Sequence, residues 1–447
     1  MNEELDQILI LPSQLNLKEK IEKLREKKAP AGRFARYESK ESLKVLEIIR
    51  EVAEEGPKEK RKYANSDDAV AGFTKDYDGV ELKPEEFRVS KEDLKKAHDE
   101  IDIELLESIC QAIENVRKYQ TEIFIGNKKH PGIKYTPIKR IGICVPGASA
   151  PLPSTVIMTV VPAQVAGVKK IVIVSPPRWN GSIHPVTLAV CYELGIDEVY
   201  RIGGAQAVAA LASDRGTIPQ VDKIVGPGNK WVQTAKKMVS QDYVGIDSIA
   251  GPSEVLIIAN DKANPAWVAA DMLSQAEHAS DSSAIAVTDS ETIAKKILKE
   301  LKNQAGKLSR AEDAKQSLLG FGAIVALNNM TEVIELVNEF AAEHLQIQCG
   351  DESRKIADKI ENAGAIFIGE YSPVAVGDYW AGPSHTLPTE MRAKFSSALT
   401  SNDFIKSTSI IEYDKKKLAE SAADIIRLAE AEGLDAHAKS IKIRQQD

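Results

Sequence analysis

Beyond residue 139, short apolar runs alternate with longer stretches in which apolar residues recur every three or four positions. The short runs predict buried strands, and the longer periodicity predicts helices with one apolar side. Predicted strands lie at residues 140–145, 171–174, 198–202, 223–225, 255–259, 284–287, 323–327, 345–348 and 365–368. Predicted helices lie at residues 155–166, 186–194, 207–212, 230–238, 265–278, 293–304, 331–342 and 354–363. This alternation predicts an α/β fold in which parallel sheets carry helices on both faces.

The alternation falls into two open α/β units, at about residues 140–245 and 250–370, and we expect the boundary near 243–247. A chain of 447 residues is too long for one hydrophobic core, which also favours two or more domains. The amphipathic residues 1–30 are predicted to be an appendage. Further helices are predicted at residues 41–56, 101–123 and 415–432.

Charge and cysteine content narrow the class of protein. A net charge of −8 and the absence of a long basic run argue against a general nucleic-acid binder. No apolar run approaches membrane-span length, and residues 1–16 lack the pattern of a secretory signal. The four cysteines are widely separated and form no CxxC pair, which fits a reducing compartment. We therefore expect a cytoplasmic protein without membrane or nucleic-acid partners.

Gln275 and His278 stand three positions apart at the end of the predicted helix 265–278, so they would share one helix face. A carboxamide oxygen and an imidazole nitrogen on one face can reach a single cation. Taken alone, a polar helix end is the simpler interpretation of this pair.

Two glycine-rich turns, at residues 203–206 and 226–229, follow predicted strands. Open α/β sheets bind ligands at the carboxyl ends of their strands, where we expect the polar residues of interest to gather. Glycines allow the backbone to approach a phosphate, and the N-terminus of a helix attracts anions. Neither turn is a GxGxxG motif, so a tight strand-to-helix turn remains the alternative.

Adjacent acid and imidazole groups, Glu343 and His344, directly precede a predicted strand. Such a pair could provide two proton-transfer groups, and the alternative is a surface pair that caps a helix end. Asp378 and His385 lie in a polar, glycine-rich stretch that is predicted to be a site loop or a simple turn.

A nitrogen- and oxygen-rich ligand set can be assembled from these stretches and from His437, which is predicted just past a helix. Its members would be Gln275, His278, Asp378 and His437. Zinc accepts such a mixture, and an oxygen-rich shell suits manganese or cobalt almost as well.

Longer motifs, taken in order, resemble the histidinol dehydrogenase family over nearly the whole chain. They lie at residues 73–80, 145–147, 150–152, 203–207, 225–229, 246–254 (IDSIAGPSE), 273–278, 343–345, 377–389 and 395–397. The resemblance implies two incomplete Rossmann-like open parallel-sheet domains with small N- and C-terminal extensions. The implied division is 1–30, then 31–138 plus 247–388, then an NAD-binding 139–246, and finally 389–447.

The resemblance also implies a two-step, NAD-dependent oxidation of L-histidinol to L-histidine through an aldehyde, the last steps of histidine biosynthesis. It implies an intertwined homodimer with one Zn²⁺ per subunit, whose fourth ligand comes from the partner chain. The implied catalytic residues are Glu343 and His344, and the implied metal ligands are Gln275, His278, Asp378 and His437. The implied substrate contacts are Ser253, Gln275, His278, His344, Asp378, Glu432 and His437. The implied NAD contacts are Gln206, Asn229 and Cys144.

Two departures from the family pattern bear on the cofactor and on one loop. Cys144 stands where many members carry a tyrosine that touches NAD. Residues 389–392 (TEMR) replace a glycine-rich segment, and Glu390 and Met391 cannot adopt positive φ freely, so we expect this loop to run differently.

Two alternatives to this activity stay open. One is a related dehydrogenase of another small alcohol, such as a sulfonated diol, although the carboxylate of Glu432 favours a cationic substrate. The other is a metal- or nucleotide-binding regulatory protein without catalysis, which the joint presence of both catalytic residues and all four ligands argues against.

Overall fold

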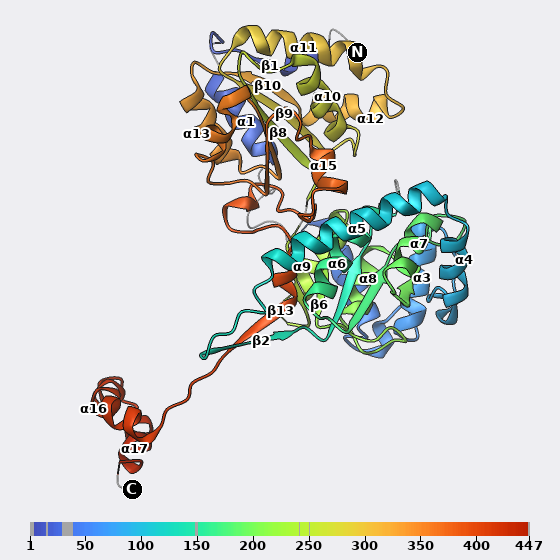
Figure 1. Cartoon of the computed structure of the whole chain (residues 1–447). Helices are drawn as coiled ribbons and strands as arrows, with labels where there is room; N and C mark the ends of the chain where they lie inside the picture. The colour runs from blue at the N-terminus through green and yellow to red at the C-terminus, as the bar shows by residue number, and fades with distance from the viewer. Residues whose placement is uncertain are drawn as a thin grey trace. The chain divides into compact units, whose positions relative to one another are not determined.

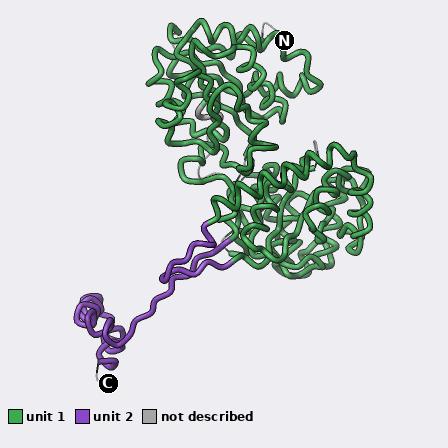
Figure 2. Tube along the Cα trace, viewed as in Figure 1, with its two compact units in different colours: residues 1–124, 137–404 green, residues 125–136, 405–447 purple. Residues whose placement is uncertain are grey.

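The computed structural model describes residues 4–14, 17–28, 39–147, 151–240, 242–249 and 251–445, without the side chains of residues 25–28. Its chain divides into two compact units (Figure 2). Unit 1 contains residues 1–124 and 137–404, and unit 2 contains residues 125–136 and 405–447.

Unit 1 contains a six-stranded parallel sheet in the order β1-β10-β9-β8-β11-β12 (Figure 1). Its strands are β1 (Leu9–Ile10), β8 (Glu254–Ala259), β9 (Ser283–Thr288), β10 (Ala323–Ala326), β11 (His344–Gln348) and β12 (Ala365–Ile368). Alternate residues of each central strand enter opposite cores. On β8, for example, Val255 and Ile257 face one core, whereas Leu256 and Ile258 face the other.

Helices cover both faces of this sheet. One core is completed by α10 (Pro265–Ala276), α11 (Glu291–Ala305) and α12 (Ala311–Phe321). The opposite core is completed by α1 (Leu17–Lys28), α13 (Met330–Phe340) and α14 (Ser353–Ala357). The short helix α15 (Val374–Tyr379) follows the last strand and buries Val374 in the first of these cores.

A second parallel sheet of unit 1 has five strands in the order β5-β4-β3-β6-β7. Its strands are β3 (Arg140–Cys144), β4 (Lys170–Val174), β5 (Glu198–Tyr200), β6 (Lys223–Val225) and β7 (Gly245–Ile246). On one face of this sheet, a hydrophobic core is completed by four helices: α2 (Lys40–Val52), α3 (Ser66–Asp78), α8 (Gly204–Leu211) and α9 (Lys230–Val239). The remaining helices are α4 (Lys91–Asp99), α5 (Ile103–Ile123), α6 (Pro153–Val165) and α7 (Pro185–Glu193). Two open parallel sheets with helices on their faces confirm the predicted α/β class.

The domain division predicted from the sequence differs from this packing. The prediction joined residues 31–138 to 247–388, but Val45, Val70 and Phe87 share a core with the five-stranded sheet. The predicted N-terminal extension contributes β1 to the edge of the six-stranded sheet. Residues 389–404 belong to unit 1, and residues 29–38 lie outside the described residues.

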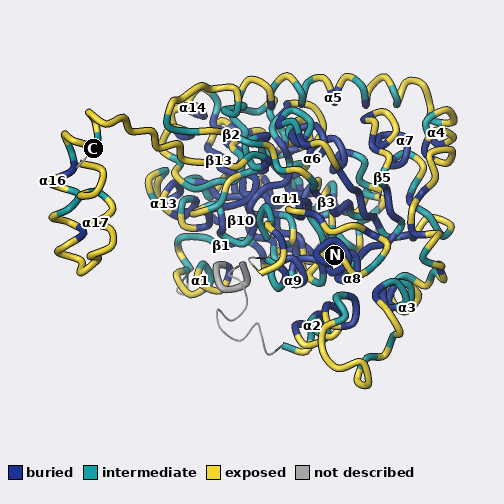
Figure 3. The backbone as a smooth tube through the Cα atoms, turned by 90° about the horizontal axis from the view of Figure 1, so that it is seen from below, coloured by how far each residue is buried: buried dark blue, intermediate teal, exposed yellow. Residues whose placement is uncertain are grey.

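Unit 2 consists of a two-stranded sheet, β2 (Ile133–Pro137) with β13 (Ile405–Ser409), and of helices α16 (Lys415–Ala431) and α17 (Asp435–Ile443). The two helices pack on each other but bury only alanines: Ala422, Ala429 and Ala438. Leu428 is 66% exposed and Ile443 is 62% exposed. Most of the backbone of α16 and α17 is coloured as exposed in Figure 3.

A search of the described helices found none that combines the length and the apolar character needed to cross a membrane.

Candidate active site

The predicted catalytic residues lie at the amino edge of the six-stranded sheet. His344 is the first residue of β11 and pairs with Val255, near the start of the neighbouring strand β8. Helix α10 connects the parallel strands β8 and β9, so it runs back across the sheet and brings Gln275 to this same edge. The expectation that these polar residues gather at the carboxyl ends of the strands is therefore wrong for this sheet, because they lie where its strands begin.

Glu343 is held by two donors. Its Oε2 accepts hydrogen bonds from Ser253 Oγ at 2.8 Å and from the backbone N–H of Glu254 at 2.7 Å. The side chain is 8% exposed, so the carboxylate has exchanged most of its water for these contacts. Ser253 Oγ also accepts a hydrogen bond from the buried carboxamide of Gln275. The two predicted substrate contacts Ser253 and Gln275 thus join one network with the predicted base.

His344 presents one ring nitrogen to the protein and leaves the other open. Nδ1 lies 2.9 Å from the carbonyl oxygen of Glu254, which only accepts, so Nδ1 carries the proton. Nε2 is buried and has no hydrogen-bond partner among the described residues. It lies 3.9 Å from Asp378 Oδ1. In the neutral ring, Nε2 is the basic nitrogen.

Asp378 stands between two imidazoles. Its Oδ1 is 3.9 Å from His344 Nε2 and 4.0 Å from His385 Nδ1. The three residues line a hollow of about 290 Å³ between β12, α15 and the segment that follows α15. Asp378 lies in the short helix α15, so the predicted irregular loop is wrong at this position.

His385 and Thr155 were given no role by sequence reasoning. Nε2 of His385 lies 3.4 Å from the hydroxyl of Thr155 on α6. The sequence signal for His385 was its place beside Asp378 in a glycine-rich stretch. Nothing in the sequence around Thr155 distinguished it from other helix residues.

The two imidazoles beside Asp378 differ in basicity. Burial lowers the pKa of His344, but the carboxylates of Glu343 and Asp378 outweigh burial and raise this pKa to about 9. Burial is the stronger influence on His385, and its pKa is lowered despite the same carboxylate of Asp378. His344 therefore has the higher proton affinity of the two.

The predicted metal ligands are only partly brought together. Gln275 is buried and Asp378 lies beside His344, but α10 ends at Ala276, so His278 lies beyond the helix and is exposed. The predicted shared helix face of Gln275 and His278 is therefore wrong. Within the described part of the chain, no three His, Cys, Asp or Glu side chains are grouped as a metal site.

The fourth predicted ligand and one predicted substrate contact belong to unit 2. His437 lies in the first turn of α17 and is exposed, and Glu432 caps the end of α16 and is also exposed. His437 was expected just past a helix, and the structure places it in a second helix that the sequence pattern did not predict.

The predicted NAD contacts surround the centre of the five-stranded sheet. Strand β3 lies between β4 and β6, so the chain order reverses beside β3, where doubly wound sheets form a ligand crevice. Gly226 follows β6, and a Cβ built on it would lie 2.5 Å from the carbonyl oxygen of Cys144 at the end of β3. Gln206 on α8 is 1% exposed, and its Nε2 has no partner within the described residues. Asn229 caps α9 by accepting from the N–H groups of Trp231 and Val232.

The environment of the Cys144 thiol does not support a contact between this thiol and a cofactor. Its side chain is part of the apolar core, and burial raises its pKa to about 12. The thiol is therefore buried, and the carbonyl oxygen of Cys144 lies next to Gly226.

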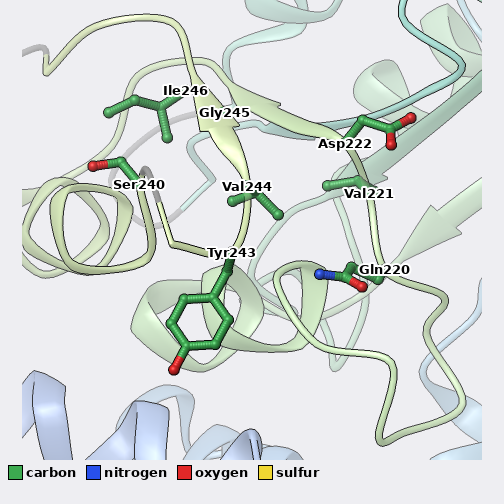
Figure 4. A pocket seen from close by; sticks show the side chains of 8 residues that line it. All are labelled: Gln220, Val221, Asp222, Ser240, Tyr243, Val244, Gly245 and Ile246. Atoms are coloured by element: carbon green, nitrogen blue, oxygen red, sulfur yellow. The ribbon is translucent and has the colours of Figure 1, made fainter. Parts of the chain in front are cut away.

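A wider hollow, of about 720 Å³, lies at the amino ends of β6 and β7 (Figure 4). It contains none of the predicted site residues. Its carboxylate, Asp222, already accepts a hydrogen bond from the backbone N–H of Arg140. This hollow therefore offers no reactive group comparable to the pair Glu343 and His344.

The loop 389–392 places two consecutive non-glycine residues at positive φ. Glu390 has φ 53° and Met391 has φ 63°, both in the left-handed region. Arg392 donates a hydrogen bond to the carbonyl oxygen of Ile249 at 3.1 Å, and the N–H of Glu390 donates to Glu254 at 3.2 Å. The expectation that Glu390 and Met391 avoid positive φ is wrong, because these contacts hold the loop in place.

The chain is similar in sequence and in structure to known proteins. The family model for histidinol dehydrogenase matches residues 35–445. A histidinol dehydrogenase of Rhodopirellula baltica is 44% identical, over 97% of this chain and 96% of the relative. One of Oceanobacillus iheyensis is 46% identical, over 90% of this chain and 93% of the relative. The crystal structure of histidinol dehydrogenase from Elizabethkingia anophelis superimposes with a TM-score of 0.87 at 34% identity and covers 98% of both chains.

Proposed function

Because the chain belongs to the histidinol dehydrogenase family, we propose that it oxidises L-histidinol to L-histidine in two NAD-dependent steps through L-histidinal. The observation that carries the proposal is the buried pair Glu343 and His344, with the open Nε2 of His344 directed at Asp378. Two separate proton acceptors are what this four-electron reaction requires, since the alcohol and the hydrated aldehyde each lose a proton.

In the first step His344 accepts the hydroxyl proton at Nε2 while the carbon transfers hydride to NAD⁺, which leaves the aldehyde. The carbonyl of Glu254 holds the proton on Nδ1 and keeps Nε2 basic. In the second step Glu343 takes a proton from water as it adds to the aldehyde, and the hydrate transfers the second hydride. Ser253, which bonds to Glu343, lies where it would orient the substrate.

The donor set proposed for Zn²⁺ suits that ion chemically, with two imidazole nitrogens, one carboxylate and one carboxamide oxygen. We propose that Gln275, His278 and Asp378 of one subunit and His437 of a second copy would hold it. Zinc would supply a fixed point that orients the amino and imidazole nitrogens of the substrate. A cation at Asp378 would also offset one of the two charges that raise the pKa of His344, which favours the neutral imidazole that a base requires.

The proposed NAD site is the crevice at the end of β3 and β6. Gln206 supports this choice, because a buried carboxamide nitrogen without a protein partner among the described residues can donate to a ligand. Asn229 is the N-cap of α9, and the positive end of the helix dipole at this N-terminus would favour an anionic group of the ligand. Cys144 would line the crevice through its backbone.

A homodimer with shared sites is proposed for two reasons. A ligand set that includes His437 needs unit 2 of another copy, and unit 2 leaves Leu428 and Ile443 exposed. Glu432 would then reach the cationic substrate from the same partner. A cytoplasmic location without nucleic-acid or membrane partners completes the proposal, since all four cysteines are free thiols that suit a reducing compartment.

The decisive experiment follows NADH production from L-histidinol with and without a chelator. We expect about two NADH per histidinol consumed, in proportion to the two oxidations, and loss of turnover on metal removal that Zn²⁺ restores. Absence of NADH from histidinol by the metal-loaded protein would overturn the proposal. NADH from a sulfonated diol instead would establish the alternative substrate class.

A further inference from the structure

A fully buried ion pair lies beneath the turn at residues 226–229. The side chain of Lys236 is 0% exposed and that of Asp247 is 4% exposed, and Lys236 Nζ lies 2.6 Å from Asp247 Oδ1. Each ion loses several kcal/mol of hydration on burial, and such pairs add little net stability compared with apolar residues. The contacts made by this pair indicate what else it does.

Both partners of the pair bind the backbone of Gly226. The N–H of Gly226 donates to Asp247 Oδ2 at 2.7 Å, and Lys236 Nζ donates to the carbonyl oxygen of Gly226 at 2.8 Å. Both backbone polar groups of Gly226 are therefore held by charged side chains, and such hydrogen bonds are the stronger kind.

The conformation that the pair holds is one that only glycine adopts freely. Gly226 has φ +103°, and a Cβ there would lie 2.5 Å from the carbonyl oxygen of Cys144. Gln233 lies three positions before Lys236, on the same face of α9, and donates to the carbonyl oxygen of Gly228 at 3.3 Å. One helix face and Asp247 thus tie the turn at both of its glycines.

We propose that Lys236 and Asp247 are positioning residues for the cofactor, which hold the turn 226–229 in its NAD-accepting shape before NAD binds. This inference rests on the proposed function, because it assumes that NAD binds at the turn. A free glycine-rich turn would lose backbone entropy on binding, and a turn that is already ordered avoids that loss. The pair should therefore act on NAD affinity more than on histidinol binding or on chemistry at saturating NAD.

The test compares Lys236→Met with Arg140→Met. Arg140 and Glu198 form the matched control, because they are an ion pair in the same sheet, at 2.6 Å with side chains 16% and 13% exposed, and do not contact the turn. We expect Lys236→Met to raise both the KM for NAD and the Kd for NADH, the latter from fluorescence without histidinol, by about tenfold or more. The KM for histidinol and kcat at saturating NAD should stay within about twofold. Arg140→Met should lower thermal stability and leave NADH affinity unchanged.

Equal losses of NADH affinity in both variants, or wild-type affinity in Lys236→Met, would overturn the inference. Asp247→Asn keeps an oxygen for the N–H of Gly226 but not the charge, and it should weaken NADH binding less than Lys236→Met. Hydrogen exchange on the wild-type protein needs no variant. The amide N–H of Gly226, which donates to Asp247, should be protected without NAD nearly as well as with it, and rapid exchange that stops only when NAD binds would refute preorganisation. If the wild-type protein binds no NADH, the proposed function fails instead.

Discussion

The imidazole of His344 and the carboxylate of Glu343 are adjacent in sequence but are held in different ways. His344 is oriented by a carbonyl oxygen through Nδ1, whereas Glu343 is oriented by a hydroxyl and a backbone N–H through Oε2. His344 Nδ1 also lies 3.4 Å from Glu343 Oε2, so a change at Glu343 alters the electrostatic environment of His344. Each group nevertheless has hydrogen-bond partners outside the pair, so a substitution of Glu343 that keeps its shape should leave His344 in position, and the two proposed proton transfers can be separated by mutation.

Glu343→Gln should slow the complete oxidation of histidinol by about 100-fold and leave the alcohol-to-aldehyde step within about threefold. The amide oxygen can still accept from Ser253 and Glu254, so the site keeps its shape while the base is lost. Loss of the negative charge also lowers the pKa of His344, which favours its neutral form. Single-turnover NADH formation from histidinol and from histidinal distinguishes the two steps.

The control is Glu370→Gln, since Glu370 accepts a hydrogen bond from the N–H of Gly350 and is not among the site residues. It should leave both steps unchanged. An equal loss of both steps in Glu343→Gln would show that Glu343 is not confined to the hydration step.

Met391 offers a test of backbone strain at a single residue. At φ 63° an alanine is strained and a glycine is not, so Met391→Gly should be more stable than Met391→Ala by about 1 kcal/mol in urea unfolding. Both variants lose the same side-chain packing, so that their difference reports the backbone alone. Glu335 is exposed within α13 and has a helical backbone. There the order should be reversed, with Glu335→Ala more stable to urea unfolding than Glu335→Gly by about 1 kcal/mol. The same order at both positions would contradict the assignment of strain to residue 391.

At the scale of elements, the alternation of apolar runs and helical periodicity identified most strands and helices of the two sheets, because both faces of the central strands are buried. It could not show where α10 ends. Leu273, Gln275 and Ala276 continue the buried face of the helix, but Glu277 takes the C-cap, and His278 lies past it. Helix ends depend on capping contacts that an apolar pattern does not encode. Asp378 and His437 were missed as helical for the related reason that α15 and α17 each bury only one side chain.

The edge of the six-stranded sheet at which the site lies was predicted wrongly. Glu343 and His344 begin β11, so their own position implied the amino edge, but the general rule for open sheets favoured the carboxyl edge. The rule fits the five-stranded sheet, where the turns at 203–206 and 226–229 follow β5 and β6. Within unit 1 the proposed NAD turn therefore follows strands, whereas the catalytic pair precedes one.

Helix α10 carries a half-buried acid, Asp271, one turn before Gln275, and this acid gives a pH-dependent prediction. Burial raises the pKa of Asp271 to about 6, and Asp271 accepts a hydrogen bond from Gln348 at 2.6 Å. Because its folded pKa exceeds the unfolded value of about 3.9, the native state binds more protons than the unfolded state between these values. The contribution of Asp271 to stability therefore falls as pH rises from about 4 to about 6.

Asp271→Asn should abolish this loss. Relative to the wild type, the variant should be about equally stable at pH 4 and about 2 kcal/mol more stable at pH 7, measured by urea midpoints of the metal-free protein. Asparagine keeps an acceptor for Gln348 and adds a donor for Gln348 Oε1, which lacks a partner within the described residues. A stability difference that does not change with pH would show that Asp271 is not the group that titrates.

At the scale of the whole molecule, the family resemblance predicted a homodimer with shared sites, which local patterns could not predict. The two sheets have the same order about β3 and about β8, and the helices α2 to α5 that precede β3 complete the five-stranded half. Residues 247–254 connect the halves in sequence, from Asp247 beneath the proposed NAD turn to Ser253 beside Glu343. Unit 2 has no comparable core, because the helices α16 and α17 bury only alanines. Burial of Leu428 and Ile443 would require the surface of another chain, and the proposed dimer would provide such a surface.

Complementation between two inactive variants tests whether that surface belongs to a second copy of the chain. His437→Ala and Gln275→Ala should each be inactive alone. In a mixed dimer, one site would combine the intact Gln275 of one chain with the intact His437 of the other, so about one wild-type site per mixed dimer should return. Co-expression with two affinity tags isolates the mixed dimer, and zinc content and NADH production are then measured together. Gln275→Ala mixed with Asp378→Ala is the matched control, because both ligands come from the same chain and each site keeps one defect, so no activity should return. Recovery in neither mixture would place all four ligands within one chain and remove the requirement for a dimer. Recovery in the control as well would show that Gln275 and Asp378 come from different chains, which contradicts the proposed ligand assignment.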